Sequence, residues 1–217
     1  MKKIRSKILL KITILVIVEI ILIVGSFSVL AYFQSQQSSI GDSINIAGKN
    51  RYLTANLLFQ TEKYIDGSSD ASQLKAAMDS LQSNIMALKQ GGRISGIDLR
   101  PLPSGLLDMW KAIDQNWNDY MTSVTQEILT PNRAKQTISL SPLIAIDRSL
   151  AEKDLESKAF NLVNSSDKLV TQLGQQTDKN SENVLFLQIL FAMLIVGILV
   201  LILYLVARML KPIFVLT

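Results

Sequence analysis

Two apolar stretches decide the fold of this chain: ITILVIVEIILIVGSFSVLAYF, residues 12–33, and VLFLQILFAMLIVGILVLILYLVA, residues 184–207. Each is over 20 residues long, which as a helix is enough to cross a hydrocarbon layer ~30 Å thick. The residues between them, 34–183, are polar, periodic and too many for a simple loop. We therefore expect a soluble module between two transmembrane helices, a layout typical of receptors.

Basic residues beside both stretches predict the orientation. Five precede the first stretch and two follow the second: Lys2, Lys3, Arg5, Lys7, Lys11, Arg208 and Lys211. An excess of Lys and Arg in short flanking segments is typical of the cytoplasmic side. We expect a two-span protein of the cell membrane, in contact with lipid, with residues 1–11 and 208–217 cytoplasmic and residues 34–183 extracytoplasmic.

The net charge of +4 for the whole chain comes from these flanks. Residues 34–183 carry 15 Lys and Arg against 17 Asp and Glu. The outer module is therefore slightly acidic, and nucleic acid is not an expected partner.

The first stretch has a second interpretation, a cleaved signal peptide, for which Val29-Leu30-Ala31 would be the cleavage site. The apolar core of a signal peptide is usually ~7–15 residues, and this stretch is longer, so we expect a retained anchor. Glu19 inside it either faces a neighbouring helix or is protonated or snorkels toward the cytoplasmic side.

The chain contains no cysteine and no histidine. Disulfides, thiolate chemistry and histidine-based metal or proton-transfer sites are excluded. It also has no glycine-rich phosphate loop and no Gly-x-Ser-x-Gly elbow. We expect no catalytic residue, no metal site, no cofactor and no enzyme activity in this chain, although a longer form could carry a histidine kinase domain.

The outer module is predicted to be an all-α, antiparallel four-helix bundle. Helix one continues from the first span to about Asp66, helix two covers 70–90 and helix three 105–129. Helix four begins near Leu143 and runs unbroken into the second span. Connectors cover 93–104 and 130–142, with almost no strand signal.

The inward faces follow from heptad-like spacing. They are Ile40, Ile44, Ala47, Arg51, Ala55, Leu58, Glu62 and Ile65 in helix one; Leu74, Met78, Leu81, Ile85 and Leu88 in helix two; Leu106, Trp110, Ile113, Trp117, Tyr120, Val124 and Ile128 in helix three; and Leu155, Ala159, Leu162, Ser166, Leu169 and Leu173 in helix four.

Arg51 is the polar exception on the predicted face of helix one, seven residues from both Ile44 and Leu58. A guanidinium there must be paired or solvated. If helix one lies at a dimer axis, two copies of Arg51 meet and a planar oxyanion between them suits their donors. Gly48, one turn earlier, lets a ligand or partner helix approach the backbone. The alternative is a salt bridge within the bundle, or a side chain that reaches water.

The segment Asn45–Leu53, NIAGKNRYL, resembles the Asn-x-Ala-Gly-x-x-Arg box of two sensor groups. These are the nitrate/nitrite-sensing histidine kinases and the N-terminal domain of type IV pilus methyl-accepting chemotaxis transducers. The resemblance implies a ligand site made by Asn45, Ala47, Gly48 and Arg51 across a dimer, with Arg51 in place of the nitrate-contacting arginine.

Two departures limit what the resemblance implies about the ligand. Asn56 stands at the position where both groups often have a second arginine. The pair Lys49-Asn50 is closer to the sequence of the pilus transducers than to that of the nitrate sensors. Trp110, Ile113 and Trp117 resemble the spacing of an aromatic-rich helix in the nitrate sensors, but core packing is the preferred explanation of these aromatics.

The segment Arg208–Thr217, RMLKPIFVLT, looks like the opening of a HAMP linker. The alternative is an ordinary basic flank, which explains Arg208 and Lys211 but not Pro-Ile-x-x-Leu-Thr. The HAMP pattern stops almost at once, so we expect the input half of a longer transducer or a truncated relative of one.

The combined prediction is the sensor module of a two-component histidine kinase, forming a homodimer. It binds a small extracytoplasmic ligand, a nitrate-like oxyanion, and relays binding by helix displacement to a cytoplasmic output domain or response regulator. One alternative is the input module of a methyl-accepting chemotaxis-type transducer. Another is a structural membrane bundle that binds a protein partner and tolerates Arg51→Leu.

Overall fold

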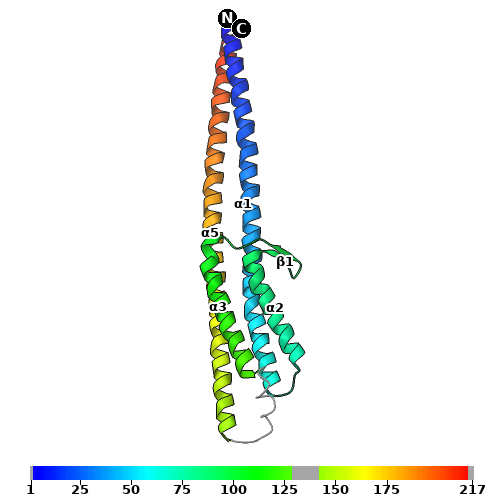
Figure 1. Ribbon diagram of the computed structural model, residues 1–217. Coiled ribbons are helices and arrows are strands. Elements are labelled where there is room, and N and C mark those ends of the chain that lie inside the picture. Colours follow the sequence, from blue (N-terminus) through cyan, green and yellow to red (C-terminus); the bar gives the residue numbers. More distant parts are fainter. Residues whose placement is uncertain (1, 129–141, 215–217) are drawn as a thin grey trace. The chain divides into compact units, whose positions relative to one another are not determined.

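The computed structural model describes residues 2–128 and 142–214, with side chains described for 9–126 and 149–208. Four long helices dominate it: α1 (Lys2–Ile65), α2 (Ala71–Gln90), α3 (Leu107–Ser123) and α5 (Pro142–Phe214) (Figure 1). The predicted all-α, four-helix chain is confirmed. The second predicted connector falls almost entirely on 129–141, outside the described residues.

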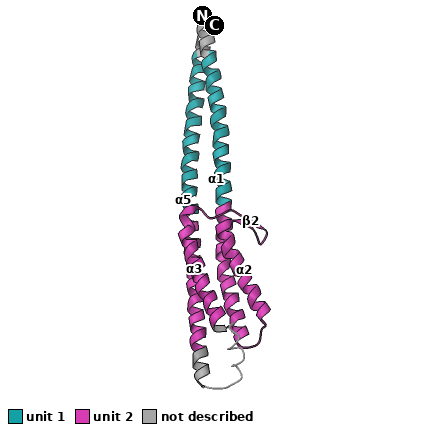
Figure 2. Ribbon diagram, in the orientation of Figure 1, with its two compact units in different colours: residues 1–38, 177–217 teal, residues 39–176 magenta. Residues whose placement is uncertain are grey.

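The chain forms two compact units, shown in Figure 2: residues 1–38 with 177–217, and residues 39–176. The first unit holds both apolar stretches. Their most apolar windows have mean hydropathies of 2.8 and 3.2 and contain no buried residue. Uncovered apolar helices of this length fit a two-span membrane protein. The HAMP-like pattern stays a prediction, because the side chains beyond 208 lie outside the described part of the chain.

The turn between α1 and α2 forms where the sequence predicts it. Gly67 has a φ of +69°, and Asp70 caps α2 by accepting hydrogen bonds from the backbone N–H of Ser72 (3.0 Å) and Gln73 (3.1 Å). The Ser72 hydroxyl also donates to this carboxylate (2.6 Å). These bonds, led by the hydroxyl, hold the pKa of Asp70 below its ordinary value. The cap fixes the start of α2.

A β-hairpin occupies the first predicted connector, where no strand was expected. Strands β1 (Gly92–Ile94) and β2 (Ile97–Leu99) pair antiparallel, with Ile94 opposite Ile97. Ser95 and Gly96 form the turn, with φ of +51° and +81°, as a type I′ hairpin turn requires. The prediction failed here because strands of three residues carry no detectable alternation.

Helix three is also more varied than predicted. A short 3₁₀ turn, η1 (Ser104–Leu106), precedes α3, and a π-helical turn, η2 (Val124–Ile128), follows it. The predicted span of 105–129 therefore contains three kinds of helical turn.

The core of residues 39–176 contains most of the predicted inward positions. All the predicted positions with described side chains in helices two, three and four are buried, except Met78, which is half-buried. Ile128 lies outside the described side chains. Trp110 adds a hydrogen bond from its Nε1 to the Ile85 carbonyl (2.7 Å), which ties α3 to α2.

The predicted inward face of α1 is wrong beyond Ala47. The buried positions are Ile40, Ser43, Ile46, Ala47, Asn50, Leu53, Thr54, Leu57 and Thr61. Four of these nine are polar, which weakens the apolar periodicity of the face. Arg51 and Glu62, both predicted inward, are exposed, and Leu58 and Ile65 are half-buried. Ala55 is exposed as well.

Tyr120 connects α3 to the far end of α1 and gives a pH-dependent prediction. The residue is fully buried, its hydroxyl lies 3.1 Å from Thr61 Oγ1, and burial raises its pKa to about 12. Its neutral form is favoured in the folded state, so this contribution to stability is complete below pH ~10 and is lost as pH rises through ~12.

The measurement is thermal unfolding of the chain in detergent between pH 9 and 12. We expect wild type to lose more stability across this range than Tyr120→Phe, which cannot ionise. Equal losses in both proteins would contradict the assignment.

Candidate functional site

The four predicted ligand-binding residues occupy two turns of α1, within residues 39–176. Asn45 and Arg51 are exposed, Gly48 is half-buried, and Ala47 is fully buried in the core. Asn45, Gly48 and Arg51 are therefore accessible on the single chain, whereas Ala47 can act only through packing. Their role in ligand binding stays a prediction.

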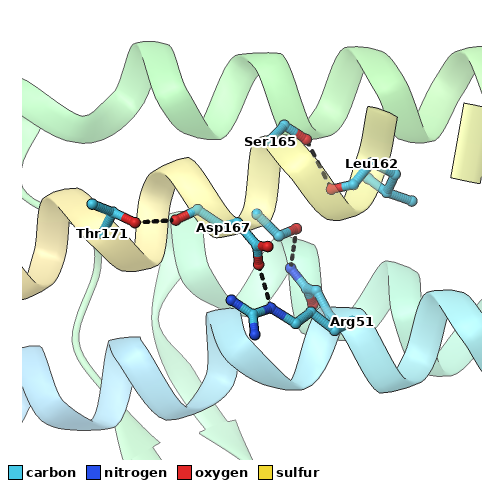
Figure 3. A network of polar contacts seen from close by, with 7 residues as sticks. Arg51, Leu162, Ser165, Asp167 and Thr171 are labelled. Carbon is cyan, nitrogen blue, oxygen red and sulfur yellow. Dashed lines mark hydrogen bonds and ion pairs between the residues drawn. The ribbon is translucent and has the colours of Figure 1, made fainter. Parts of the chain in front are cut away.

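Arg51 forms an ion pair with Asp167 of α5 (Figure 3). Its Nε donates to the Asp167 carboxylate, and the two side chains are 57% and 36% exposed. This is the salt bridge within the bundle that the sequence left open as an alternative. Because both groups meet water, the pair contributes little to stability. Its effect is to orient the guanidinium, with Nε engaged and the two terminal nitrogens directed away from Asp167.

Asn50 lies beside Arg51 and faces the core instead. It is fully buried. Its Oδ1 accepts from Asn84 Nδ2 of α2 (2.5 Å), and its Nδ2 donates to Ser166 Oγ of α5 (3.3 Å). Asn84 also donates to the Ile46 carbonyl (2.7 Å). One buried carboxamide pair thus joins three helices at the level of the sequence box.

The sequence does not predict a structural role in the site for Asn50, Asn84 or Asp167. The available signal was weak: Asn84 lies three residues after Leu81 and four before Leu88, at a heptad position of α2. A polar residue at a heptad core position often fixes the register of packed helices. Asp167 is one of many carboxylates, and only the structure distinguishes it.

Lys49 connects the box to the hairpin. Its Nζ donates to Ser95 Oγ at the turn between β1 and β2 (2.9 Å). Three consecutive box residues therefore contact three different parts of the bundle: Lys49 the hairpin, Asn50 the core of α2 and α5, and Arg51 the surface of α5.

The outer face of α1 carries a second regular pattern. Gly41, Gly48 and Ala55 are spaced by seven residues, as are Asn45, Tyr52 and Phe59. Tyr52 and Phe59 are 68% and 49% exposed. A Cβ added at Gly41 or Gly48 would meet nothing within 4 Å, so the space beside both glycines is open.

Exposed large apolar side chains in residues 39–176 are confined to two helices. Among the described side chains of this unit they are Tyr52 and Phe59 on α1 and Leu150 and Phe160 on α5, with none on α2 or α3. Isolated exposed apolar residues are ordinary, but this set lies on the two helices that continue into the apolar stretches. The exposed large apolar residues described in this unit therefore lie on α1 and α5 alone.

The described residues of the site form polar contacts among α1, α2 and α5. In the part of the chain whose side chains are described, no group of three or more acidic residues is placed to hold a metal ion. The described acidic side chains at the site are exposed or paired, as Asp167 is with Arg51. What the geometry provides is a set of polar contacts that hold α1 and α5 in one register.

Comparison with known families gives a match over residues 32–141, just over half of the chain, to PilJ, the type IV pili methyl-accepting chemotaxis transducer N-terminal domain. The match includes the whole Asn45–Arg51 box together with α2, the hairpin and α3. Comparisons with curated proteins and with solved structures give no match. The length of the family match, and its position on the bundle, show that the chain belongs to the family of type IV pili methyl-accepting chemotaxis transducer N-terminal domains.

Proposed function

We propose that this chain is the input module of a chemotaxis-type transducer, which detects a small extracytoplasmic ligand and relays it as a displacement of α5 against α1. The observation that carries this proposal is the paired contact between the two helices. Asn50 meets Ser166 and Arg51 meets Asp167, so consecutive residues of α1 contact consecutive residues of α5. Both helices continue into the apolar stretches. A shift at this level is therefore transmitted along two continuous helices.

The output lies in a cytoplasmic domain that receives this displacement. The family match favours a chemotaxis-type output, and the box's resemblance to nitrate-sensing kinases keeps a histidine kinase as the alternative. Helix shifts of ~1–2 Å are typical of such transitions. A ligand can drive the shift only by its different affinity for the two packings. The chain itself acts as a receptor and not as an enzyme.

The ligand proposed for the box is a small planar oxyanion held by Arg51. Asp167 engages Nε and leaves the two terminal guanidinium nitrogens for an anion. The carboxylate offsets part of the positive charge, so one guanidinium binds an anion weakly. A second copy of the chain supplies a second Arg51, and two guanidinium groups then share the anion.

The anion proposal is tested by thermal unfolding of the detergent-solubilised chain with nitrate, nitrite, sulfate and phosphate. A ligand at 100 times its Kd stabilises by ~2.7 kcal/mol if it binds only the folded form. We expect a rise in Tm with a planar anion for wild type and no rise for Arg51→Ala. Without anion, Arg51→Ala should change stability by less than ~1 kcal/mol, because the ion pair is exposed.

Arg93→Ala is the matched control, since Arg93 is exposed on the hairpin, and it should keep the response. A rise that persists in Arg51→Ala would contradict the site. No response to any anion, together with an unaffected Arg51→Leu, would favour the structural bundle that binds a protein partner.

The dimer is proposed to form along the outer face of α1. Two membrane anchors give every copy the same orientation, so two α1 helices meet in parallel, and the seven-residue spacing of Gly41, Gly48 and Ala55 allows close packing. The exposed Tyr52 and Phe59 supply apolar area on the same face.

Cysteine crosslinking in native membranes tests this dimer. The chain has no cysteine, and a side chain at Gly48 meets nothing within 4 Å of its Cβ, so Gly48→Cys should fold normally. We expect Gly48→Cys to form a disulfide-linked dimer under mild oxidation. Ser83→Cys, on the exposed side of α2, should remain monomeric under the same conditions. Equal crosslinking at both positions would exclude α1 as the specific interface.

A further inference from the structure

A groove between α3 and α5 lies apart from the box. Its volume is about 280 Å³, and it is lined by Met109, Ala112 and Asn116 from α3 and by Asn161, Asn164, Ser165 and Lys168 from α5. This volume is just below the ~300–1,000 Å³ of common ligand pockets, so the groove has room only for a ligand of a few non-hydrogen atoms.

The polar groups of the groove have unused hydrogen-bonding capacity. Asn116 Nδ2 donates to the Asn161 carbonyl (3.3 Å). Among the described residues, the carboxamides of Asn161 and Asn164 have no hydrogen-bond partner. Asn161 is exposed and Asn164 half-buried, so both can exchange water for a ligand. Asparagine has a low helix propensity, so three asparagines beside one groove lower the intrinsic stability of α3 and α5.

Lys168 is the one formal charge lining the groove. Its ammonium has no carboxylate within ion-pair distance among the described side chains. The neighbouring carboxylate of Asp167 is engaged by Arg51 instead. The groove therefore has a positive end at Lys168 and carboxamides further along α5. Asn164 lies about one helical turn (~6 Å) from Lys168 and Asn161 about two turns (~10 Å).

We propose that this groove binds a small carboxylate that carries further hydrogen-bonding groups. Its carboxylate meets the Lys168 ammonium, its polar groups meet Asn116, Asn161 and Asn164, and its carbon chain lies against Met109 and Ala112. This is a second site, distinct from the oxyanion site proposed at Arg51.

One turn of α5 links the two sites. Ser165 and Lys168 line the groove, while Ser166 contacts Asn50 and Asp167 pairs with Arg51. Figure 3 shows Ser165 and Asp167 projecting from opposite sides of this turn. A ligand that pulls this turn toward α3 changes the contacts it makes with α1. This coupling rests on the proposed function, whereas the binding itself does not.

The test is calorimetric titration of the full detergent-solubilised chain with L-malate, succinate, citrate, L-asparagine and L-glutamine, with glycerol as the uncharged comparison. We expect at least one carboxylate to bind, and Lys168→Met and Asn164→Leu each to weaken that binding about tenfold or more. Lys153→Met, the same change at an exposed position of α5, should leave the affinity unchanged.

Three results would overturn the proposal: no carboxylate of the panel binds, glycerol binds equally well, or Lys168→Met keeps full affinity. Arg51→Ala separates the two sites. Carboxylate binding that survives Arg51→Ala supports the groove even if no anion binds at the box. Carboxylate binding lost in Arg51→Ala but kept in Lys168→Met assigns the ligand to the box and excludes the groove.

Discussion

Replacing Asn84 with leucine is expected to lower the free energy of unfolding of the bundle by about 3 kcal/mol. Asn84 Nδ2 donates to both the Ile46 carbonyl (2.7 Å) and Asn50 Oδ1 (2.5 Å). Leucine replaces neither bond and leaves the fully buried Asn50 Oδ1 without its donor. An unsatisfied buried polar group costs ~1–3 kcal/mol, and the branched side chain adds steric cost in a filled core.

The measurement is thermal unfolding followed by the helical circular dichroism signal, in which we expect a decrease in Tm of roughly 10 °C. Asn118→Leu is the matched control: Asn118 is exposed on α3, and the same substitution there should change stability by less than ~0.5 kcal/mol.

The double variant Asn50→Leu/Asn84→Leu distinguishes the hydrogen bond from packing. It removes both partners, so no carboxamide remains unsatisfied, and its destabilisation should be smaller than the sum of the two single effects by ~1 kcal/mol or more. Additive effects would show that the carboxamide pair is energetically unimportant and that each asparagine acts only through its volume.

The contrast between α1 and the other helices explains how much of the fold the sequence could predict. In α2, α3 and α5 the core positions are mostly apolar, and spacing alone located them. In α1 the core includes Ser43, Asn50, Thr54 and Thr61, and hydrogen bonds such as that from Thr61 Oγ1 to the Leu57 carbonyl (2.8 Å) satisfy all of them except Thr54. The apolar spacing of Ile44 and Leu58, which are half-buried, therefore predicted an inward face of α1 that is displaced by about one residue from the observed buried face.

This rotation changed the interpretation of the candidate site. On the predicted face, Arg51 would be buried and would need a ligand or a partner. On the observed face Arg51 is exposed, and the buried polar residue of the box is Asn50. The sequence box located the turn of α1 that contacts α2 and α5. The partners Asn84, Ser166 and Asp167 are distant in sequence from the box and follow only from the packing of the helices.

The second large effect concerns the hairpin that the sequence did not predict. The hairpin reaches the box through the hydrogen bond from Lys49 to Ser95, and its position depends on the turn at Gly91. Gly91 caps α2 with φ +72° and ψ −166°, a combination that is essentially restricted to glycine. Its N–H donates to the Ala87 carbonyl (2.8 Å). The chain then returns so that the Leu102 N–H donates to the Leu88 carbonyl (3.1 Å).

Gly91→Ala is expected to cost about 3–4 kcal/mol, since backbone strain of ~1–3 kcal/mol adds to a steric clash. A Cβ at Gly91 would lie 2.8 Å from the Leu99 carbonyl oxygen and 2.8 Å from Pro101 Cδ, and neither backbone nor proline ring can move aside easily.

Gly92→Ala is the matched control, because Gly92 also has a positive φ (+111°) but open space around its Cβ; it should cost only the strain. The two variants are compared by thermal unfolding and by protease sensitivity of residues 92–99. Equal Tm values for the two would show that the hairpin moves freely away from α2, and the contact between Lys49 and Ser95 would then be too weak to hold the hairpin against the box.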